Sequence, residues 1–290
     1  MKKMAKIKIM VDSAADIPEE VLKKHNMGLI PMLSVFGDDA YVIGEDITTD
    51  EFYKKLETCE SVPKTSLTPY AKLKEILLEE SKNNDTVIYF TISSKASGQN
   101  HSANLVKEDI LESDNPDADI RIIDSMTFSM IIGYDAINAA VDAEAGMSAD
   151  EIIEKATKSI AKWRVLFVVS DLMYLEKGGR LRKSTAILGN LLDIKPVLTV
   201  SDGMIEVETK LRGKKKICQK ICNLIEEYGD LDESAEDFII LHSDFDKAAE
   251  AEEAIKENFG DDKNVILCQL GPLIGTHTGS GIVAFVYRTK

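Results

Sequence analysis

Apolar residues in this chain form two kinds of pattern, short continuous runs and longer stretches with helical spacing. The clearest run is TVIYFT at residues 86–91, whose length and β-branched and aromatic content predict a buried strand. In the first half such runs alternate with helical patterns. The expected elements there are strand 6–11, helices 18–25, 50–57 and 69–81, strand 86–91, helix 98–111, strand 120–123 and helix 129–145. This alternation predicts a mainly parallel, Rossmann-like α/β domain over residues 1–150.

The second half has a different order of elements. The expected ones are helix 149–161, strand 164–169, a tight turn at 177–180, a helical run at 184–191, strands 195–200 and 205–209, helix 213–228, strand 238–241, helix 247–259 and strands 265–268 and 282–287. Asp202-Gly203 lies between two of these strands and indicates a hairpin, because both residue types accept positive φ. A hairpin places antiparallel pairs in the sheet, so we expect an α+β domain with a mixed sheet over residues 151–290.

Composition excludes several classes of partner. The net charge of −15 argues against nucleic acid or an anionic membrane surface as a bulk electrostatic partner, since both attract positive proteins. No stretch approaches the roughly 20 apolar residues of a membrane span, so we expect no stable membrane insertion. The four cysteines lack zinc or redox spacing, and Cys218 and Cys222 are expected to be half-buried thiols on one helix. These features predict a reduced, cytoplasmic protein.

Four polar clusters lie where predicted strands end and loops or helices begin. They are DSAADIP at 12–18, Thr65-Ser66, SSKASG at 93–98 and GPLIGTHTGSG at 271–281. Together they supply hydroxyls, one imidazole and glycines, which suit a small anion. The polar residues at 12–13, 93–94 and 124–125 also fall at the carboxyl ends of predicted parallel strands, where such sheets bind ligands. The pattern therefore predicts a small-molecule site.

Each hydroxyl cluster has two interpretations. Thr65-Ser66 precedes helix 69–81, so it either caps that helix or helps to bind an anion at its N-terminal end. The 93–98 cluster has more hydroxyls than one cap requires, which favours a binding site. It is not a P-loop, because it lacks the Gly-Lys-Ser/Thr ending.

His277 lies among glycines, which would let the backbone approach a ligand. With Ser97 or Ser94 it would make a nucleophile pair, and a Ser/His hydrolase of acyl esters is the alternative function. The chain has no Gly-x-Ser-x-Gly elbow to support that alternative. A phosphate- or nucleotide-binding module is a third hypothesis. The acidic residues match no calcium loop, and we expect neither a metal nor a cofactor.

Taken together, the clusters resemble the DegV family of bacterial fatty-acid-binding proteins, which serve a fatty acid kinase. The resemblance extends from about residue 9 to residue 285. The matching pieces are DSAADIP at 12–18, Thr65-Ser66, SSKASG at 93–98, IDS at 123–125, LEKGGR at 175–180, Lys195-Pro196, Gly203 and GPLIGTHTGSG at 271–281.

The resemblance implies a carrier rather than an enzyme, with a long-chain fatty acid as its ligand and no cofactor. The fatty acid would lie in a tunnel between the two domains, and the kinase would phosphorylate its carboxylate to an acyl phosphate that feeds phospholipid synthesis. The carboxylate ligands carried over are Thr65, Ser97, Arg212 and His277, with Ser66, Ser94 and Gly98 adjacent. Arg180 resembles the surface residue on which the kinase docks.

Three motifs depart from the usual family pattern. Thr-Ser-Gln-Pro becomes TSLTP at 65–69, Ser-Gly-Thr becomes SGQ at 97–99, and His-x-Gly-Pro-Gly becomes HTGSG at 277–281. None of the departures removes a proposed carboxylate ligand. They bear instead on the geometry around the head group.

Overall fold

The computed structural model describes residues 5–182, 194–213 and 215–290, and these form two compact units. Unit 1 comprises residues up to Thr48 together with Pro63–Ala161, and unit 2 comprises Thr49–Val62 and Lys162–Lys290. The helical run expected at 184–191 lies outside the described residues.

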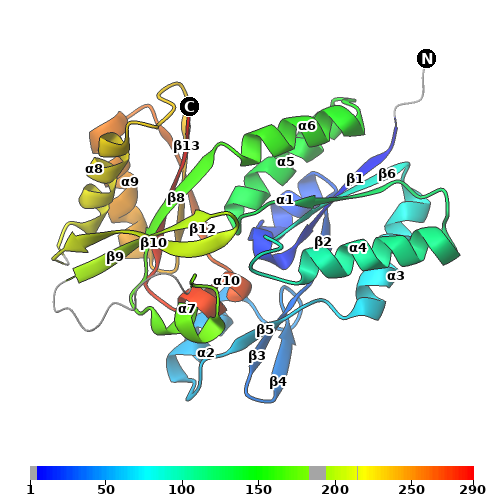
Figure 1. The fold of residues 1–290 in the computed structure, drawn as a ribbon, viewed down its shortest axis with the longest axis horizontal. Helices are drawn as coiled ribbons and strands as arrows, with labels where there is room; N and C mark the ends of the chain where they lie inside the picture. Colours follow the sequence, from blue (N-terminus) through cyan, green and yellow to red (C-terminus); the bar gives the residue numbers. More distant parts are fainter. Residues whose placement is uncertain (1–4, 183–193, 214) are drawn as a thin grey trace. The chain divides into compact units, whose positions relative to one another are not determined.

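Unit 1 is built on a four-stranded, fully parallel sheet with the strand order β2-β1-β6-β7 (Figure 1). Its strands are β1 (Ile7–Asp12), β2 (Gly28–Ile30), β6 (Thr86–Thr91) and β7 (Ile120–Asp124). All six residues of β6 are buried, as expected for a central parallel strand with both faces covered. The predicted parallel α/β architecture is confirmed.

The helices of unit 1 follow the predicted order. They are α1 (Glu19–Lys24), α3 (Tyr70–Asn83), α4 (Gln99–Asp109), α5 (Met130–Glu144) and α6 (Ala149–Ile160), with short turns η1 (Ser13–Ala15) and η2 (Ile110–Asp114). Apolar residues of α3 and α4, such as Leu73 and Val106, pack with Met10, Val87 and Tyr89 of the sheet in one buried cluster. This cluster supports the strands that end at the polar edge described below.

A second, small sheet in unit 1 was not expected. β3 (Leu33–Phe36) pairs antiparallel with β4 (Asp39–Val42) and with β5 (Lys64–Ser66). These strands have three or four residues each, which is too short for a period-two pattern to stand out from loop sequence. β3 and β4 form a hairpin with only residues 37 and 38 between them, and β5 pairs with β3 from further along the chain. Backbone pairing, not a period-two pattern, makes all three of them strands.

Two features of the units differ from the expected division at 150/151. Helix α6 packs against α5, so unit 1 continues to Ala161. Residues 49–62, which carry α2 (Thr49–Thr58), belong to unit 2, because α2 contacts α10 (Pro272–Thr278) and buries Phe52 completely.

Unit 2 contains the predicted mixed sheet, in the order β10-β9-β8-β13-β11-β12. Its strands are β8 (Trp163–Val168), β9 (Ile194–Ser201), β10 (Met204–Arg212), β11 (Asp237–His242), β12 (Asn264–Gln269) and β13 (Val283–Arg288). Only β11 and β12 are parallel among the strand pairs described. The β9–β10 hairpin turns at Asp202 and Gly203, with φ of 47° and 73°, as the sequence predicts.

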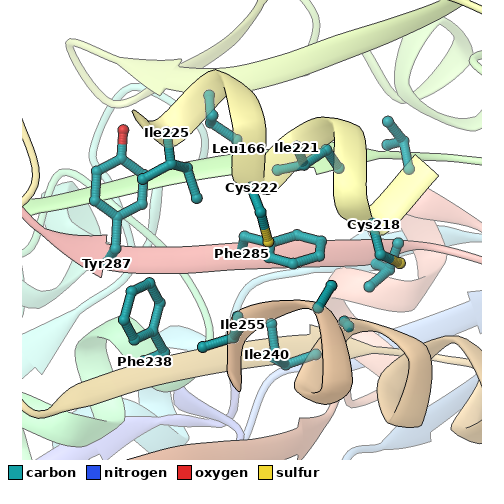
Figure 2. Packing of buried hydrophobic residues seen from close by; sticks show 14 of the residues in the cluster. Leu166, Cys218, Ile221, Cys222, Ile225, Phe238, Ile240, Ile255, Phe285 and Tyr287 are labelled. Atoms are coloured by element: carbon teal, nitrogen blue, oxygen red, sulfur yellow. The ribbon is translucent and has the colours of Figure 1, made fainter. Parts of the chain in front are cut away.

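Helices α8 (Ile217–Tyr228) and α9 (Phe245–Phe259) cover one core of unit 2, and α7 (Met173–Gly178) is a short additional helix. Figure 2 shows Cys218, Ile221 and Cys222 of α8 directed toward the layer that contains Phe285. Both thiols are fully buried rather than half-buried, and burial raises the pKa of each to about 12. Among the described residues, no helix has the length and apolar content needed to cross a membrane.

Candidate functional site

The carboxyl edge of the parallel sheet is tied together by two carboxylates. Asp12 Oδ1 accepts a hydrogen bond from Ala14 N at 3.0 Å, and its Oδ2 accepts one from Ile92 N at 2.8 Å. Asp124 Oδ1 accepts from Ser94 N at 3.0 Å. The polar residues at 12–13, 93–94 and 124–125 therefore lie at this edge, as expected. Burial raises the pKa of Asp12 to about 7, although its two N–H donors act in the opposite direction.

The 93–98 segment forms a tight turn that leads into α4. Ser97 N donates to Ser93 O at 3.0 Å, and Ser97 Oγ accepts from Gln99 N at 3.2 Å. Gly98 is the N-cap residue of α4, and Ser94 is exposed. The Ser97 hydroxyl therefore has a capping role through its oxygen. Because a hydroxyl accepts and donates independently, its hydrogen can still be given to an anion.

Thr65 and Ser66 lie in strand β5 and not at a helix end. Thr65 is opposite Ser34 and Ser66 is opposite Leu33 in the antiparallel pairing with β3. The N-cap residue of α3 is Pro69, which makes no side-chain cap. The capping interpretation of this pair is therefore wrong, since strand pairing holds the two hydroxyls four or more residues before the helix begins. Anion binding by the pair stays a prediction.

The two hydroxyl segments of unit 1 are linked by Gln99 and Thr68. The Gln99 side chain hydrogen-bonds both the backbone N–H and the hydroxyl of Thr68. A Cβ placed on Gly98 would lie 3.3 Å from Leu67 Cδ1, so the segments also touch beside this link. Gln99 and the Leu67-Thr68 pair are two of the three departures from the family pattern, and the structure shows that they contact each other.

His277 lies in helix α10 of unit 2, an element that the sequence pattern did not predict. The glycines of this segment admit neighbouring side chains of unit 2. A Cβ on Gly275 would lie 2.7 Å from Phe52 Cε1, and one on Gly279 would lie 2.6 Å from Tyr174 Cδ2. At these two glycines the backbone is approached by protein side chains, so close packing within unit 2 explains them.

The imidazole of His277 lies against the C-terminal end of α7. A Cβ on Gly178 would be 2.5 Å from His277 Nδ1, so only a glycine leaves room for the ring. Burial first, and the positive charge of Arg180 second, lower the pKa of His277 to about 4. His277 is therefore neutral at pH 7 and presents one N–H donor.

Arg180 contacts the same segment of α7. Its guanidinium Nη1 donates to Gly178 O, and burial lowers the pKa of Arg180. The sequence placed Arg180 only at a docking surface. The structure brings it close enough to His277 to lower the pKa of the imidazole. No part of the sequence pattern indicated this pairing.

Arg212 ends strand β10, where it is opposite Ile194 and exposed. Its backbone carbonyl accepts from Lys220 Nζ at 2.5 Å. The candidate residues therefore fall in two groups. Unit 1 carries Thr65, Ser66, Ser94, Ser97 and Gly98, and unit 2 carries Arg180, Arg212 and His277.

A hollow of about 600 Å³ in unit 2 contains none of these residues. It is lined by Glu226, Phe259, Lys290 and neighbouring residues of α8, α9 and the C-terminus. Its mixed acidic and basic lining does not suit an apolar ligand, and the geometry of the hydroxyl and histidine segments is the better guide to function.

The model of the family described as "Uncharacterised protein, DegV family" matches residues 6–290. The chain belongs to the DegV family. A DegV domain-containing protein of Clostridium acetobutylicum is 34% identical over 286 residues, which cover 98% of this chain and 98% of that protein.

Solved DegV structures share the fold over nearly the whole chain. A fatty acid binding DegV family protein from Streptococcus agalactiae has a TM-score of 0.86 and 30% identity, covering 99% of each chain. A stearic acid-binding protein from Eubacterium ventriosum has a TM-score of 0.85 and 28% identity, covering 97% of this chain and 98% of that one.

Proposed function

We propose that this DegV protein binds a long-chain fatty acid and presents its carboxylate to a fatty acid kinase in the cytoplasm, as a carrier and not as an enzyme. The observation that carries the proposal is the likeness over nearly the entire chain to proteins described as binding fatty acids, one of them stearic acid. The product would be an acyl phosphate for phospholipid synthesis.

The donors at the candidate positions suit a carboxylate. Thr65 and Ser97 each carry a hydroxyl, and both lie in segments that Gln99 and Thr68 join. A histidine whose pKa is lowered to about 4 offers a neutral N–H. These three donors are neutral and orient a carboxylate without neutralising its charge, which leaves its oxygens nucleophilic toward a phosphoryl group. Arg212 is the one charged group among the proposed ligands.

The acyl chain should supply most of the affinity. About 15 methylenes at roughly 0.8 kcal/mol each contribute on the order of 12 kcal/mol before the costs of association. Each hydrogen bond to the ionised head adds about 1.5–3 kcal/mol. We therefore propose that Thr65, Ser97, Arg212 and His277, with Ser66, Ser94 and Gly98 beside them, mainly orient the ligand.

The test is mass spectrometry of an organic extract of the purified protein, beside an intact-mass spectrum of the polypeptide. One equivalent of fatty acid with an unmodified polypeptide is the expected result. An empty extract, or an acylated polypeptide, would contradict the carrier and favour a Ser/His hydrolase. In that case covalent labelling of Ser97 by a fluorophosphonate would identify the nucleophile.

The kinase role needs a separate experiment, in which the loaded protein is incubated with a fatty acid kinase and ATP. We expect acyl phosphate to form, and we expect a Thr65→Ala/His277→Ala double variant to lower its rate by at least tenfold without unfolding. Arg180→Ala should slow turnover more than it weakens fatty acid binding. Equal turnover by the double variant and the natural chain would contradict the site.

A further inference from the structure

Gln99 is a fully buried residue at the start of α4 whose side-chain amide makes three hydrogen bonds. Its Oε1 accepts from Thr68 N at 3.2 Å. Its Nε2 donates to Thr68 Oγ1 and to Tyr89 Oη, both at 3.0 Å. One side chain therefore joins α4, the segment after β5, and the central strand β6.

The orientation of this amide is determined by its partners. The Thr68 hydroxyl donates its only hydrogen to Pro31 O at 2.8 Å, so it can only accept from Gln99. The Thr68 N–H can only donate. Flipping the Gln99 amide would place donor against donor and oxygen against oxygen, and the side chain is therefore held in one position.

The two segments that Gln99 joins both carry proposed head-group hydroxyls. Thr65 is three residues before Thr68 and is held in β5 by its pairing with Ser34. Ser97 is two residues before Gln99, and its hydroxyl oxygen accepts from Gln99 N at 3.2 Å. The distance along the chain from the link to either hydroxyl is short, so the link sets how the two hydroxyls stand relative to each other.

We propose that Gln99 is a positioning residue for carboxylate recognition. It acts through Thr68 and Ser97 to keep the Thr65 and Ser97 hydroxyls in a constant position relative to each other. The inference rests on the proposed fatty acid function. It makes Gln99 a determinant of selectivity for acids over uncharged lipids, because only the acid depends on both hydroxyls.

The test compares the delipidated natural chain with Gln99→Met and Thr68→Val. Methionine keeps the volume of glutamine without its amide, and valine keeps the shape of threonine without its hydroxyl. Dissociation constants are measured for palmitic acid and for hexadecan-1-ol, which share the chain but not the carboxylate. We expect each variant to lose about tenfold in affinity for the acid and less than about twofold for the alcohol.

The matched control is Asn115→Ala. It removes another partly buried amide of unit 1, which donates to Ser81 Oγ at 3.2 Å and joins no candidate residue. We expect this variant to keep the natural ratio of acid to alcohol affinity. An unchanged ratio in both Gln99→Met and Thr68→Val, whether or not overall affinity falls, would overturn the positioning role. Failure of the natural chain to prefer the acid would instead overturn the proposed function.

Discussion

At the scale of single residues, the space left by Gly178 decides where the His277 ring lies. A methyl group at position 178 would come within 2.5 Å of His277 Nδ1, a distance that real carbon atoms do not adopt. The three atoms nearest to the added carbon all belong to the His277 ring, so the ring would have to leave its position. Gly178 is therefore as much a part of the candidate site as His277, although it has no side chain to bind anything.

We predict that Gly178→Ala weakens palmitic acid binding by about tenfold, equivalent to about 1.4 kcal/mol, because the displaced imidazole no longer points its N–H correctly. Calorimetric titration of the delipidated protein measures the effect. The control is Gly229→Ala, which has φ of 64° and nothing within 4 Å of the added carbon. That variant should lose about 1 kcal/mol of stability and no affinity. Equal affinities of the two variants would contradict the role of Gly178.

Asp12 gives a prediction for the pH dependence of stability. Its pKa is raised from 3.8 to about 7 by burial, so between these values the unfolded chain releases a proton that the folded chain keeps. The contribution of Asp12 to the free energy of unfolding is fully present below pH 4. It decreases by up to about 4 kcal/mol as the pH rises toward 7. Urea unfolding of the natural chain and Asp12→Asn at pH 4, 5.5 and 7 measures the difference. We expect the natural chain's relative stability to fall with pH, and a constant difference would refute the assignment.

At the scale of elements, α7 and α10 fit together through reciprocal glycine contacts. Gly178 of α7 faces His277 of α10, while Gly279 at the end of α10 faces Tyr174 of α7. Tyr53 of α2 adds a hydrogen bond to Leu270 O at 3.1 Å, just before α10 begins. Three short helices, two of which the sequence did not predict, thereby hold the histidine.

Helix α8 gives a second element-scale prediction. Cys218 and Cys222 lie on its buried face, and a thiol with a pKa near 12 is ionised in only about one molecule in ten thousand at pH 8. We expect a thiol reagent to modify half-buried Cys59 first and to leave Cys218 and Cys222 intact until the protein is denatured. Peptide mapping after timed iodoacetamide treatment checks this. Labelling of the α8 thiols at the rate of Cys59 would show that the helix does not pack as described.

At the scale of the whole molecule, ligand binding should stabilise the folded chain by mass action. Fatty acid at 100 times its dissociation constant adds about 2.7 kcal/mol to the free energy of unfolding. For a chain of 290 residues that corresponds to a rise in Tm of roughly 4–5 °C. Differential scanning calorimetry of delipidated protein with and without palmitic acid tests this. Inorganic phosphate is the control, and a rise with phosphate alone would point to an anion-binding module instead.

Prediction from sequence succeeded where elements are long and strongly patterned. Strand β6 was predicted with the bounds that the structure shows, and the β9–β10 hairpin followed from Asp202-Gly203. It failed for β2, β3, β4, β5, α7 and α10, which have three to seven residues each. Elements this short carry too little periodicity of their own, and they form because tertiary partners pair with them or bury them.

The candidate site shows the same division. Residue types and spacing alone indicated hydroxyls, a histidine and glycines at a sheet edge, because hydroxyl and imidazole chemistry does not depend on the fold. The sequence pattern did not indicate that Gln99 would hydrogen-bond to Thr68 or that Gly178 would face His277. It also did not indicate that Arg180 would lower the pKa of His277.

The sequence by itself determined that one domain has a parallel sheet and the other a mixed one, the family and the kind of chemistry the site can offer, because periodicity and residue type are local properties. Only the tertiary structure decided which residue positions each functional group and in which direction the pKa of His277 is shifted. It also decided that α2 belongs to unit 2. Those properties arise from contacts between segments far apart in the chain, whose distances and burial are not recorded in the order of the residues.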